Sequence, residues 1–314
     1  MTGPARILLP YPLADLGAPL PGPPEALVWD GAAEPPDAAA LAGIEFFVIP
    51  YTRTHRALPL LGLMPRLRVV QSLSAGVEEL LPHVPRGVLL CNARGVHDAS
   101  TAELALTLTL AALRGVPGFV RAQQEGRWEG GCHPALADRT VLLVGYGAIG
   151  QAVEARLAPF ECTVLRVART ARPGARGEVH GLADLDTLLP RADVVILTVP
   201  LTAATRGLAG RDFLARLRDG ALLVNVARGA VVDTSALLAE LATGRLTAAL
   251  DTTDPEPLPP GHPLWHAPGV LISPHVGGNS TAFRPRALRL IRTQLQRHLR
   301  GEPPLNRVGP AAEA

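Results

Sequence analysis

Short, uninterrupted apolar runs recur through the first third of the chain, separated by segments that are rich in proline and glycine or have helical periodicity. A strand with one buried face alternates apolar and polar residues, whereas a strand covered on both faces is apolar throughout. The runs therefore predict a parallel sheet with helices on both faces, in one small α/β domain of residues 1 to about 98. Its expected strands are residues 6–9, 26–29, 46–49, 67–71 and 88–91.

The same alternation of apolar runs and helical segments returns from residue 141 and predicts a second doubly wound parallel sheet. Helices are expected to fill the gaps between strands, including residues 212–218, ended by Gly220, and residues 234–243, ended by Gly244. The expected strands are residues 141–144, 163–167, 194–199, 222–226, 247–250 and 270–272.

A long helix is expected between the two sheets. Ser100 and Glu103 form the S-x-x-E pattern of a capping box, which predicts that the helix begins there. Leucines at positions 104, 106, 108, 110 and 113 cover nearly its whole circumference, which indicates a helix buried between domains or subunits. Gly115 and Pro117 should end it, and a second helix should then run towards Trp128.

The stretch V-L-L-V-G-Y-G-A-I-G at residues 141–150 has the pattern of a strand that turns tightly into a helix. Gly145 permits the turn, Gly147 lets the backbone approach a pyrophosphate, and Gly150 lets the helix pack closely against the sheet. The helix N-terminus then offers free N–H groups to phosphates. With a strand before it and a helix after it, the pattern predicts a dinucleotide site rather than an ordinary βα turn. The cofactor-binding residues expected in this turn are Gly145, Tyr146, Gly147, Ala148 and Ile149.

The composition fits a globular protein of two domains and excludes one kind of catalysis. With 314 residues and 47% hydrophobic content, the chain can fill two ordinary cores. All 30 basic residues are arginine, so covalent catalysis through a lysine Schiff base is excluded.

Charge and cysteine content indicate the compartment and the classes of partner. The net charge of +2 gives no indication of nucleic-acid binding, and the six arginines of a final helix over residues 281–300 are typical of a solvated face. Cys91, Cys132 and Cys162 lack C-x-x-C spacing, and no apolar run reaches transmembrane length. We therefore expect a cytoplasmic protein without a nucleic-acid or membrane partner.

The residue after the second strand of the second sheet distinguishes the two nicotinamide dinucleotides. In NAD sites this position is usually acidic and binds the adenosine ribose hydroxyls. Here the strand is followed by Ala168, Arg169, Thr170 and Arg172, without a carboxylate. Guanidinium groups bind a 2′-phosphate bidentately, whereas an acid would repel it. The sequence therefore predicts NADP(H) in preference to NAD(H).

Three later segments follow expected strands, at the edge where ligands bind in open α/β sheets. They are N-V-A-R-G at residues 225–229, L-D-T-T-D-P-E-P at residues 250–257 and S-P-H-V-G-G at residues 273–278. Together with the glycine turn, V-P-L-T at residues 199–202 and H-P-L-W at residues 262–265, they resemble the D-isomer-specific 2-hydroxyacid dehydrogenase family. The resemblance covers most of the chain, from about residue 72 to residue 278, and the order and spacing of the motifs make it specific.

The resemblance implies a role for each charged residue in these segments. Arg228 would bind the substrate carboxylate and 2-oxo oxygen. His275 would be the general acid for carbonyl reduction and the base for the reverse oxidation, with Glu256 raising its pKa. Glu256 is favoured over Asp254 because it lies five residues after Asp251, the spacing of the family. Asp251 itself would hold the nicotinamide carboxamide. Further cofactor contacts are expected at Val199, Pro200, Val226 and Ala227.

Residues 72–78, S-L-S-A-G-V-E, are similar to the family's carboxylate-binding loop, whose backbone N–H groups face the substrate. Ala75, Gly76 and Val77 are therefore expected to bind substrate, the alternative being a plain strand-to-helix turn. Ser74 and Glu78 stand where the family often has a glycine and usually an aspartate, which leaves the loop shape and the substrate size open.

These features predict an oxidoreductase that transfers a hydride between NADP(H) and a small 2-oxo or D-2-hydroxy acid, of the glyoxylate or hydroxypyruvate type. A Rossmann dinucleotide-binding domain, residues 99–282, is expected as an insertion in a flavodoxin-like substrate domain of residues 1–98 and 283–314. The resemblance and the buried helix after Ser100 imply a homodimer. No metal is expected, because His262 and His266 lack partners at ligand spacing.

Two alternative functions share the same motifs, and the first is a phosphoglycerate-type dehydrogenase. Tyr51, Arg53 and Arg56 follow an expected strand and either face the far side of the substrate or simply lie on the surface. A phosphoglycerate-type enzyme would use the two arginines to bind a phosphate. A non-enzymatic, cofactor-sensing binding protein on the same fold is the second alternative, and the presence of Arg228, Glu256 and His275 argues against it.

Overall fold

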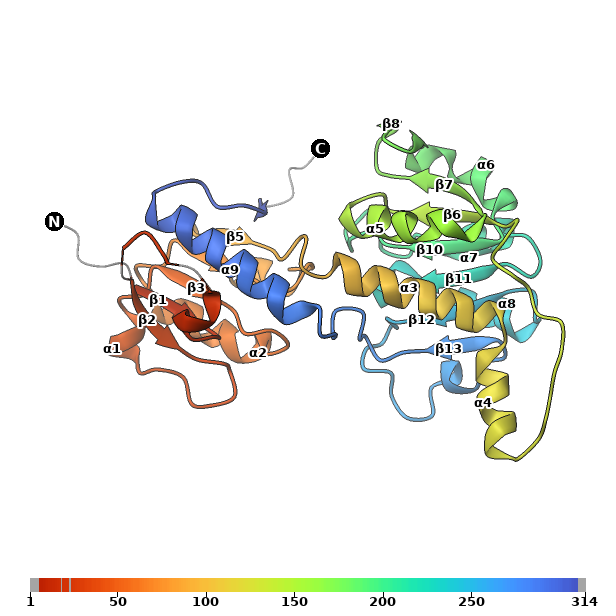
Figure 1. Cartoon of the computed structure of the whole chain (residues 1–314), viewed down its shortest axis with the longest axis horizontal. Helices are drawn as coiled ribbons and strands as arrows, with labels where there is room; N and C mark the ends of the chain where they lie inside the picture. Colours follow the sequence, from red (N-terminus) through yellow and green to blue (C-terminus); the bar gives the residue numbers. More distant parts are fainter. Residues whose placement is uncertain (1–5, 18, 23, 310–314) are drawn as a thin grey trace. The chain divides into compact units, whose positions relative to one another are not determined.

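The computed structural model describes residues 6–17, 19–22 and 24–309, and it divides into two compact units (Figure 1). One unit is Met1–His97 with Thr281–Ala314, and the other is Asp98–Ser280. The second unit is therefore one continuous insertion in the first. Each unit contains a parallel sheet of its own, which confirms the fold class predicted from the apolar runs.

The first unit has a flavodoxin-like sheet. Its strand order is β14-β5-β4-β3-β1-β2, in which only β14 is antiparallel to its neighbour. Successive side chains of a strand point to opposite faces, so Ile7 and Leu9 pack against α9 while Leu8 packs on the other face with Leu41 of α1 and Ala57 of α2. The elements are β1 (Arg6–Leu9), β2 (Glu25–Val28), α1 (Ala38–Leu41), β3 (Phe46–Val48), α2 (Thr54–Ala57), β4 (Val69–Gln71), β5 (Leu89–Cys91), α9 (Phe283–Leu299) and β14 (Arg307–Val308).

The second unit has the Rossmann arrangement, with six parallel strands in the order β13-β12-β11-β10-β6-β7. The direction of winding reverses between β6 and β10, and ligands bind at such a switch point. The strands and helices are α3 (Asp98–Leu113), α4 (Val116–Gln124), β6 (Thr140–Val144), α5 (Ala148–Leu157), β7 (Thr163–Val167), α6 (Leu185–Leu188), β10 (Val194–Leu197), α7 (Arg211–Arg216), β11 (Leu222–Asn225), α8 (Thr234–Ala242), β12 (Thr247–Leu250) and β13 (Val270–Ile272).

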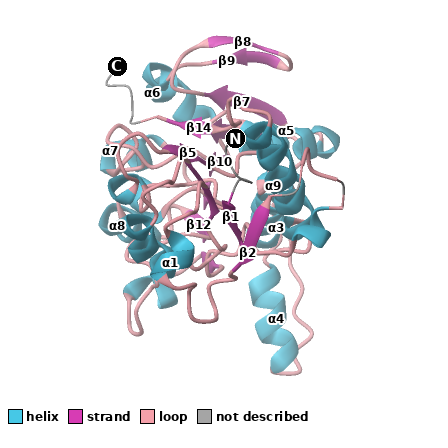
Figure 2. Cartoon of the chain, turned by 90° about the vertical axis from the view of Figure 1, so that its left-hand side faces the viewer, coloured by secondary structure: helices cyan, strands magenta, loops and turns pink. Residues whose placement is uncertain are grey.

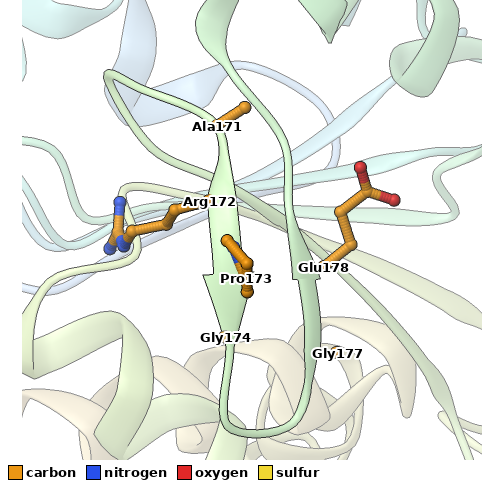
Figure 3. A pocket seen from close by; sticks show the side chains of 6 residues that line it. All are labelled: Ala171, Arg172, Pro173, Gly174, Gly177 and Glu178. Atoms are coloured by element: carbon orange, nitrogen blue, oxygen red, sulfur yellow. The ribbon is translucent and has the colours of Figure 1, made fainter.

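Two gaps between strands of the second unit differ from the expectation of a helix: the one after β12 holds only a 3-10 helix, Pro263–His266, and the one after β7 begins with a hairpin before it reaches α6. After β7 the chain forms a two-stranded antiparallel hairpin of β8 (Arg172–Gly174) and β9 (Gly177–Val179), drawn beyond β7 in Figure 2 and from close by in Figure 3. Gly177 has a φ of +124°, a conformation that favours glycine and closes this tight turn. His180, the residue that follows β9, then pairs with Val167 as a single parallel bridge. The hairpin and this bridge therefore take the place of a third full strand beside β7.

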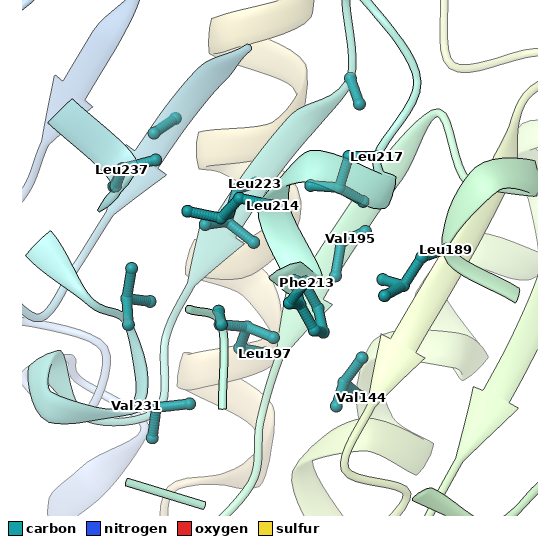
Figure 4. Packing of buried hydrophobic residues seen from close by; sticks show 14 of the residues in the cluster. Val144, Leu189, Val195, Leu197, Phe213, Leu214, Leu217, Leu223, Val231 and Leu237 are labelled. Carbon is teal, nitrogen blue, oxygen red and sulfur yellow. The ribbon is translucent and has the colours of Figure 1, made fainter. Parts of the chain in front are cut away.

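The core of the second unit lies in two layers, one on each face of the sheet. Leu142, Val195 and Leu223 point to one face and pack with Leu214 of α7 and Leu237 of α8 (Figure 4). The alternate strand residues, such as Val141 and Val194, point to the opposite face and pack with α3 and α5. Because burial of apolar surface drives folding, these layers fix the strand ends from which the site loops emerge.

The long helix is buried as expected, but it begins earlier than the capping box predicted. α3 starts at Asp98, so Ser100 is buried in the first turn instead of capping it. The carboxylate of Glu103 lies 3.2 Å from Arg156 of α5, an ion pair that the local pattern does not contain. Gly115, with a φ of +67°, separates α3 from α4. The S-x-x-E capping box is a local pattern, and the burial of Ser100 and the ion pair of Glu103 are tertiary features that it does not predict.

Among the described residues, no single helix has the length and apolar character to cross a membrane. α3 and α4 reach that length and apolar character only when taken together, and the two helices are bent by 67° relative to each other.

Candidate active site

The glycine turn has a shape that only glycine allows at two of its positions. Gly145 has a φ of +108°, and a Cβ there would lie 2.6 Å from the backbone of Thr198 and Val199. A Cβ on Gly150 would lie 2.2 Å from the carbonyl oxygen of Gly145. A Cβ on Gly147, by contrast, would meet nothing within 4 Å. The turn is therefore closed against its own sheet and open at Gly147, which is where a pyrophosphate would approach the N-terminus of α5.

The end of β7 carries no acid. Ala168 is nearly buried, while Arg169 and Thr170 are exposed, and Arg172 begins the hairpin. Arg172 donates from Nη2 to the carbonyl oxygen of Tyr146 at 3.0 Å, which ties the hairpin to the glycine turn. Within the described ranges, neither Arg169 nor Arg172 has a carboxylate partner, so both retain charge for an anion. Figure 3 shows Arg172 and Glu178 pointing to opposite sides of the hairpin. Both guanidinium groups are thus available to bind an anion at this end of the sheet.

The loops that follow β12 and β13 bring a histidine and a carboxylate together. Nδ1 of His275 lies 2.5 Å from Oε1 of Glu256. The pair is partly accessible, with 43% of the His275 side chain and 38% of the Glu256 side chain exposed. The hydrogen bond to Glu256 raises the pKa of His275 above its ordinary value, although burial and the charge of Arg228 act in the opposite direction. Because Glu256 occupies Nδ1, Nε2 is the nitrogen suited to exchange a proton with a substrate.

Asp251 organises the loop that holds His275. Its Oδ1 accepts hydrogen bonds from Ser273 Oγ at 2.6 Å and from the N–H of Val276 at 2.9 Å, and its Oδ2 accepts one from the N–H of Gly277 at 2.9 Å. The backbone N–H of His275 also donates to the carbonyl oxygen of Asp251, at 2.7 Å. His275 has a φ of +51°, an uncommon conformation for a non-glycine residue that such contacts can maintain at a functional site. The proposed contact of Asp251 with a carboxamide stays a prediction.

Arg228 lies on the loop after β11, beside the loop that carries Glu256. Asn225 shapes this loop, since it donates to the carbonyl oxygen of Arg228 at 3.0 Å and accepts from the N–H of Ala227 at 3.0 Å. A Cβ on Gly229 would lie 1.8 Å from the carbonyl oxygen of Thr253, so glycine allows the two loops to touch. Arg228 is close enough to His275 for its charge to act on the imidazole. An arginine and a protonatable histidine therefore lie at one sheet edge.

The remaining positions expected to contact the cofactor also follow strands of this sheet. Val199, Val226 and Ala227 are almost completely buried, and Pro200 is exposed. The hydroxyl of Thr205 donates to the carbonyl oxygen of Pro200 at 2.6 Å and holds that turn. Their contact with a cofactor stays a prediction.

In the first unit, the segment of Ala75, Gly76 and Val77 is a loop held by hydrogen bonds to its carbonyl oxygens. Asn92 donates to the carbonyl oxygen of Ala75 at 3.0 Å, and His97 Nε2 lies 2.7 Å from the carbonyl oxygen of Leu73. Bonding through the carbonyls leaves backbone N–H groups to face a ligand. Substrate binding by this loop stays a prediction.

Several supporting residues were not found from the sequence. Asn92 and His97 act through contacts with distant segments, and no local pattern marks them. Ser273 lies in the S-P-H-V-G-G segment, but its hydrogen bond to Asp251 was not predicted. Of the two arginines expected to face substrate or surface, Arg56 has local partners, since it donates to the carbonyl oxygens of Gly31 at 2.8 Å and Ala32 at 2.6 Å. No group of three His, Cys, Asp or Glu side chains in the described part of the chain could hold a metal ion.

Comparison with known proteins agrees with this geometry. Residues 106–277 match the family model for the NAD-binding domain of D-isomer-specific 2-hydroxyacid dehydrogenases. A relative from Mus musculus named glyoxylate reductase/hydroxypyruvate reductase is 36% identical over 75% of this chain and 75% of its own length.

Solved structures of the same family cover nearly the whole chain. A family protein from Aeromonas salmonicida has a TM-score of 0.85 and 28% identity, and covers 98% of this chain and 99% of its own. An enzyme from Xanthobacter autotrophicus, solved with NADPH and MES, has a TM-score of 0.78 and 31% identity over 98% of this chain and 99% of its own. The chain therefore belongs to the D-isomer-specific 2-hydroxyacid dehydrogenase family and is an oxidoreductase of that family.

Proposed function

We propose that the protein is an NADP(H)-dependent reductase of small 2-oxo acids, of the glyoxylate or hydroxypyruvate type. The observation that carries the proposal is the His275–Glu256 pair beside Arg228, at the sheet edge that also carries the glycine turn. The name of the mouse relative, glyoxylate reductase/hydroxypyruvate reductase, supports the substrate class. A purely cofactor-sensing protein would have no use for a paired, partly exposed histidine next to an arginine.

The chemistry divides between the cofactor and the chain. When bound, the nicotinamide supplies or accepts the hydride at C2 of the substrate. Arg228 binds the substrate carboxylate and polarises its carbonyl, because a guanidinium offers two parallel donors to such a group. His275 donates a proton from Nε2 to the carbonyl oxygen as that oxygen gains electron density. Glu256 holds the imidazole by Nδ1 and stabilises its protonated form before that transfer.

The preference for NADP(H) rests on the end of β7. Ala168 stands where a carboxylate would repel a 2′-phosphate, and Arg169 and Arg172 supply positive charge there. The bound NADPH of the Xanthobacter autotrophicus structure supports this proposal. With two arginines and no carboxylate at this position, the site favours the 2′-phosphorylated ribose of NADP(H).

Steady-state assays with NADPH and NADH, each with glyoxylate and hydroxypyruvate, test the proposal. We expect a higher kcat/KM with NADPH. Arg169→Ala should lower kcat/KM for NADPH about tenfold to a hundredfold, because it removes a charged hydrogen bond to the phosphate. The kcat/KM for NADH should stay almost unchanged. Arg191→Ala, at another exposed arginine that precedes β10 at the opposite sheet edge, is the matched control. A clear preference for NADH in the unmodified enzyme would contradict the cofactor assignment.

We also propose a homodimer. Apolar side chains on α4 and the segment after it are exposed: Val116 by 41%, Val120 by 48% and Trp128 by 104%. Apolar side chains that gather on a surface usually mark an interaction site, and a second copy of the chain would cover this one. Sedimentation velocity should give the mass of two chains, and a monomer at micromolar concentration would contradict the proposal.

A further inference from the structure

The side chain of Tyr146, in the middle of the glycine turn, points inward and not towards solvent. It is 7% exposed, and its hydroxyl donates a hydrogen bond to Oε2 of Glu154 on α5. Glu154 is 3% exposed, and burying a carboxylate is costly unless it is paired. The turn is therefore anchored to the helix that it begins, eight residues further along the chain.

Arg166 of β7 completes this network. Its Nε donates to Oε1 of Glu154 at 2.8 Å, and its Nη2 donates to the same oxygen. Nη1 donates to the carbonyl oxygen of Val164 at 3.0 Å and lies beneath Gly177 of the hairpin, 3.1 Å from where a Cβ would be. Burial by itself would raise the pKa of Glu154, but the hydrogen bonds from Arg166 and Tyr146 outweigh it and hold that pKa below its usual value. Glu154 is thus ionised at neutral pH.

The backbone around Tyr146 is held from three further directions. Arg172 donates to the carbonyl oxygen of Tyr146 at 3.0 Å, and Thr198 donates to that of Gly145 at 2.5 Å. The N–H of Gly145 donates to the carbonyl oxygen of Val167 at 2.9 Å. With these carbonyls fixed, the orientation of the N–H groups on the open side of the turn is fixed as well. Those N–H groups, at the start of α5, are the ones a pyrophosphate would accept from.

We propose that Tyr146, Glu154 and Arg166 are positioning residues of the dinucleotide site. Through the hydroxyl of Tyr146, the network orients the turn and sets the affinity for the pyrophosphate, which NADPH and NADH share. This inference rests on the proposed function. It differs from the role of Arg169, which acts on the 2′-phosphate of NADPH alone. Loss of the network should therefore weaken the binding of both cofactors by the same factor and leave the ratio of their affinities unchanged.

Equilibrium titration with NADPH and with NADH, followed by cofactor fluorescence, tests this in Tyr146→Phe and Glu154→Gln. We expect the Kd of both cofactors to rise about tenfold, the effect of losing one hydrogen bond to a charged group. The fall in kcat should be smaller than the rise in cofactor KM, because the proton-transfer groups lie on other loops. Since Tyr146→Phe keeps the ring and the Glu154–Arg166 pair, it remains informative if Glu154→Gln folds poorly.

The Glu240–Arg245 pair provides a matched control. Arg245 Nε lies 2.6 Å from Glu240, and the two side chains are 23% and 20% exposed, but the pair precedes β12, at the opposite sheet edge from the glycine turn. Glu240→Gln should lower Tm and leave both Kd values unchanged. The proposal is overturned if Tyr146→Phe leaves both Kd values unchanged, if it alters only one of them, or if Glu240→Gln changes them equally. Failure of the unmodified protein to bind either cofactor would instead refute the proposed function.

Discussion

His275→Asn should lower kcat/KM for glyoxylate reduction by about 10²–10⁴-fold, the usual contribution of a positioned general acid. The substitution removes the imidazole that pairs with Glu256 through Nδ1 and would donate from Nε2. Asparagine is chosen because His275 has a φ of +51°, and asparagine adopts that conformation more readily than most residues. The loss should therefore appear in turnover while Tm stays close to that of the unmodified enzyme.

The control for this substitution is His266→Asn, an exposed histidine in the turn Pro263–His266. It should leave kcat/KM unchanged. Nearly normal turnover in His275→Asn would rule out His275 as the proton donor.

The pH profile adds a second test of the same pair. Reduction needs the protonated imidazole, so kcat/KM should fall as pH rises through the pKa of His275. The hydrogen bond that His275 donates to Glu256 raises that pKa, which keeps the enzyme active to higher pH. In Glu256→Gln the falling limb should move to lower pH, because the neutral amide no longer stabilises the imidazolium. A limb that does not move would show that Glu256 has no electrostatic role.

Sequence patterns predicted the features that depend on local order and composition. β1, β7, β12 and β13 have the bounds expected from the mainly apolar runs of the sequence. Two of the three glycines of the turn, Gly145 and Gly150, meet a steric requirement that no other residue satisfies, and Gly147 was identifiable from the spacing of the pattern. The resemblance to the family then named Arg228, Glu256 and His275, which no composition argument singles out.

Features that depend on contacts between distant segments were not predictable in this way. Helices were expected to fill the gaps between strands, yet Arg172 begins a hairpin after β7, because Gly174 and Gly177 allow a tight return. Ser273 lies in the S-P-H-V-G-G segment, but its role is evident only from its hydrogen bond to Asp251, 22 residues earlier. The capping box at Ser100 failed for the same reason: burial and the Glu103–Arg156 ion pair are tertiary.

Arg228→Lys should lower kcat/KM by roughly 10²–10³-fold and Arg228→Ala by more, because the site needs two parallel donors and not only a positive charge. The lysine ammonium is a point charge and cannot bind a carboxylate and a carbonyl oxygen in one plane. The loop should survive both changes, since Asn225 holds it through backbone atoms, at 3.0 Å to the carbonyl oxygen of residue 228.

Three measurements distinguish this role of Arg228 from a structural one. Guanidinium chloride at low millimolar concentration should restore part of the turnover of Arg228→Ala and none of that of His275→Asn. Arg191→Lys, at an exposed site that precedes β10, should behave as the unmodified enzyme. Because Arg228 lies close enough to His275 to lower its pKa, Arg228→Ala should also extend the falling limb of the pH profile to higher pH. Full activity in Arg228→Lys would mean that charge alone is sufficient, and the two-donor contact with the substrate would have to be abandoned.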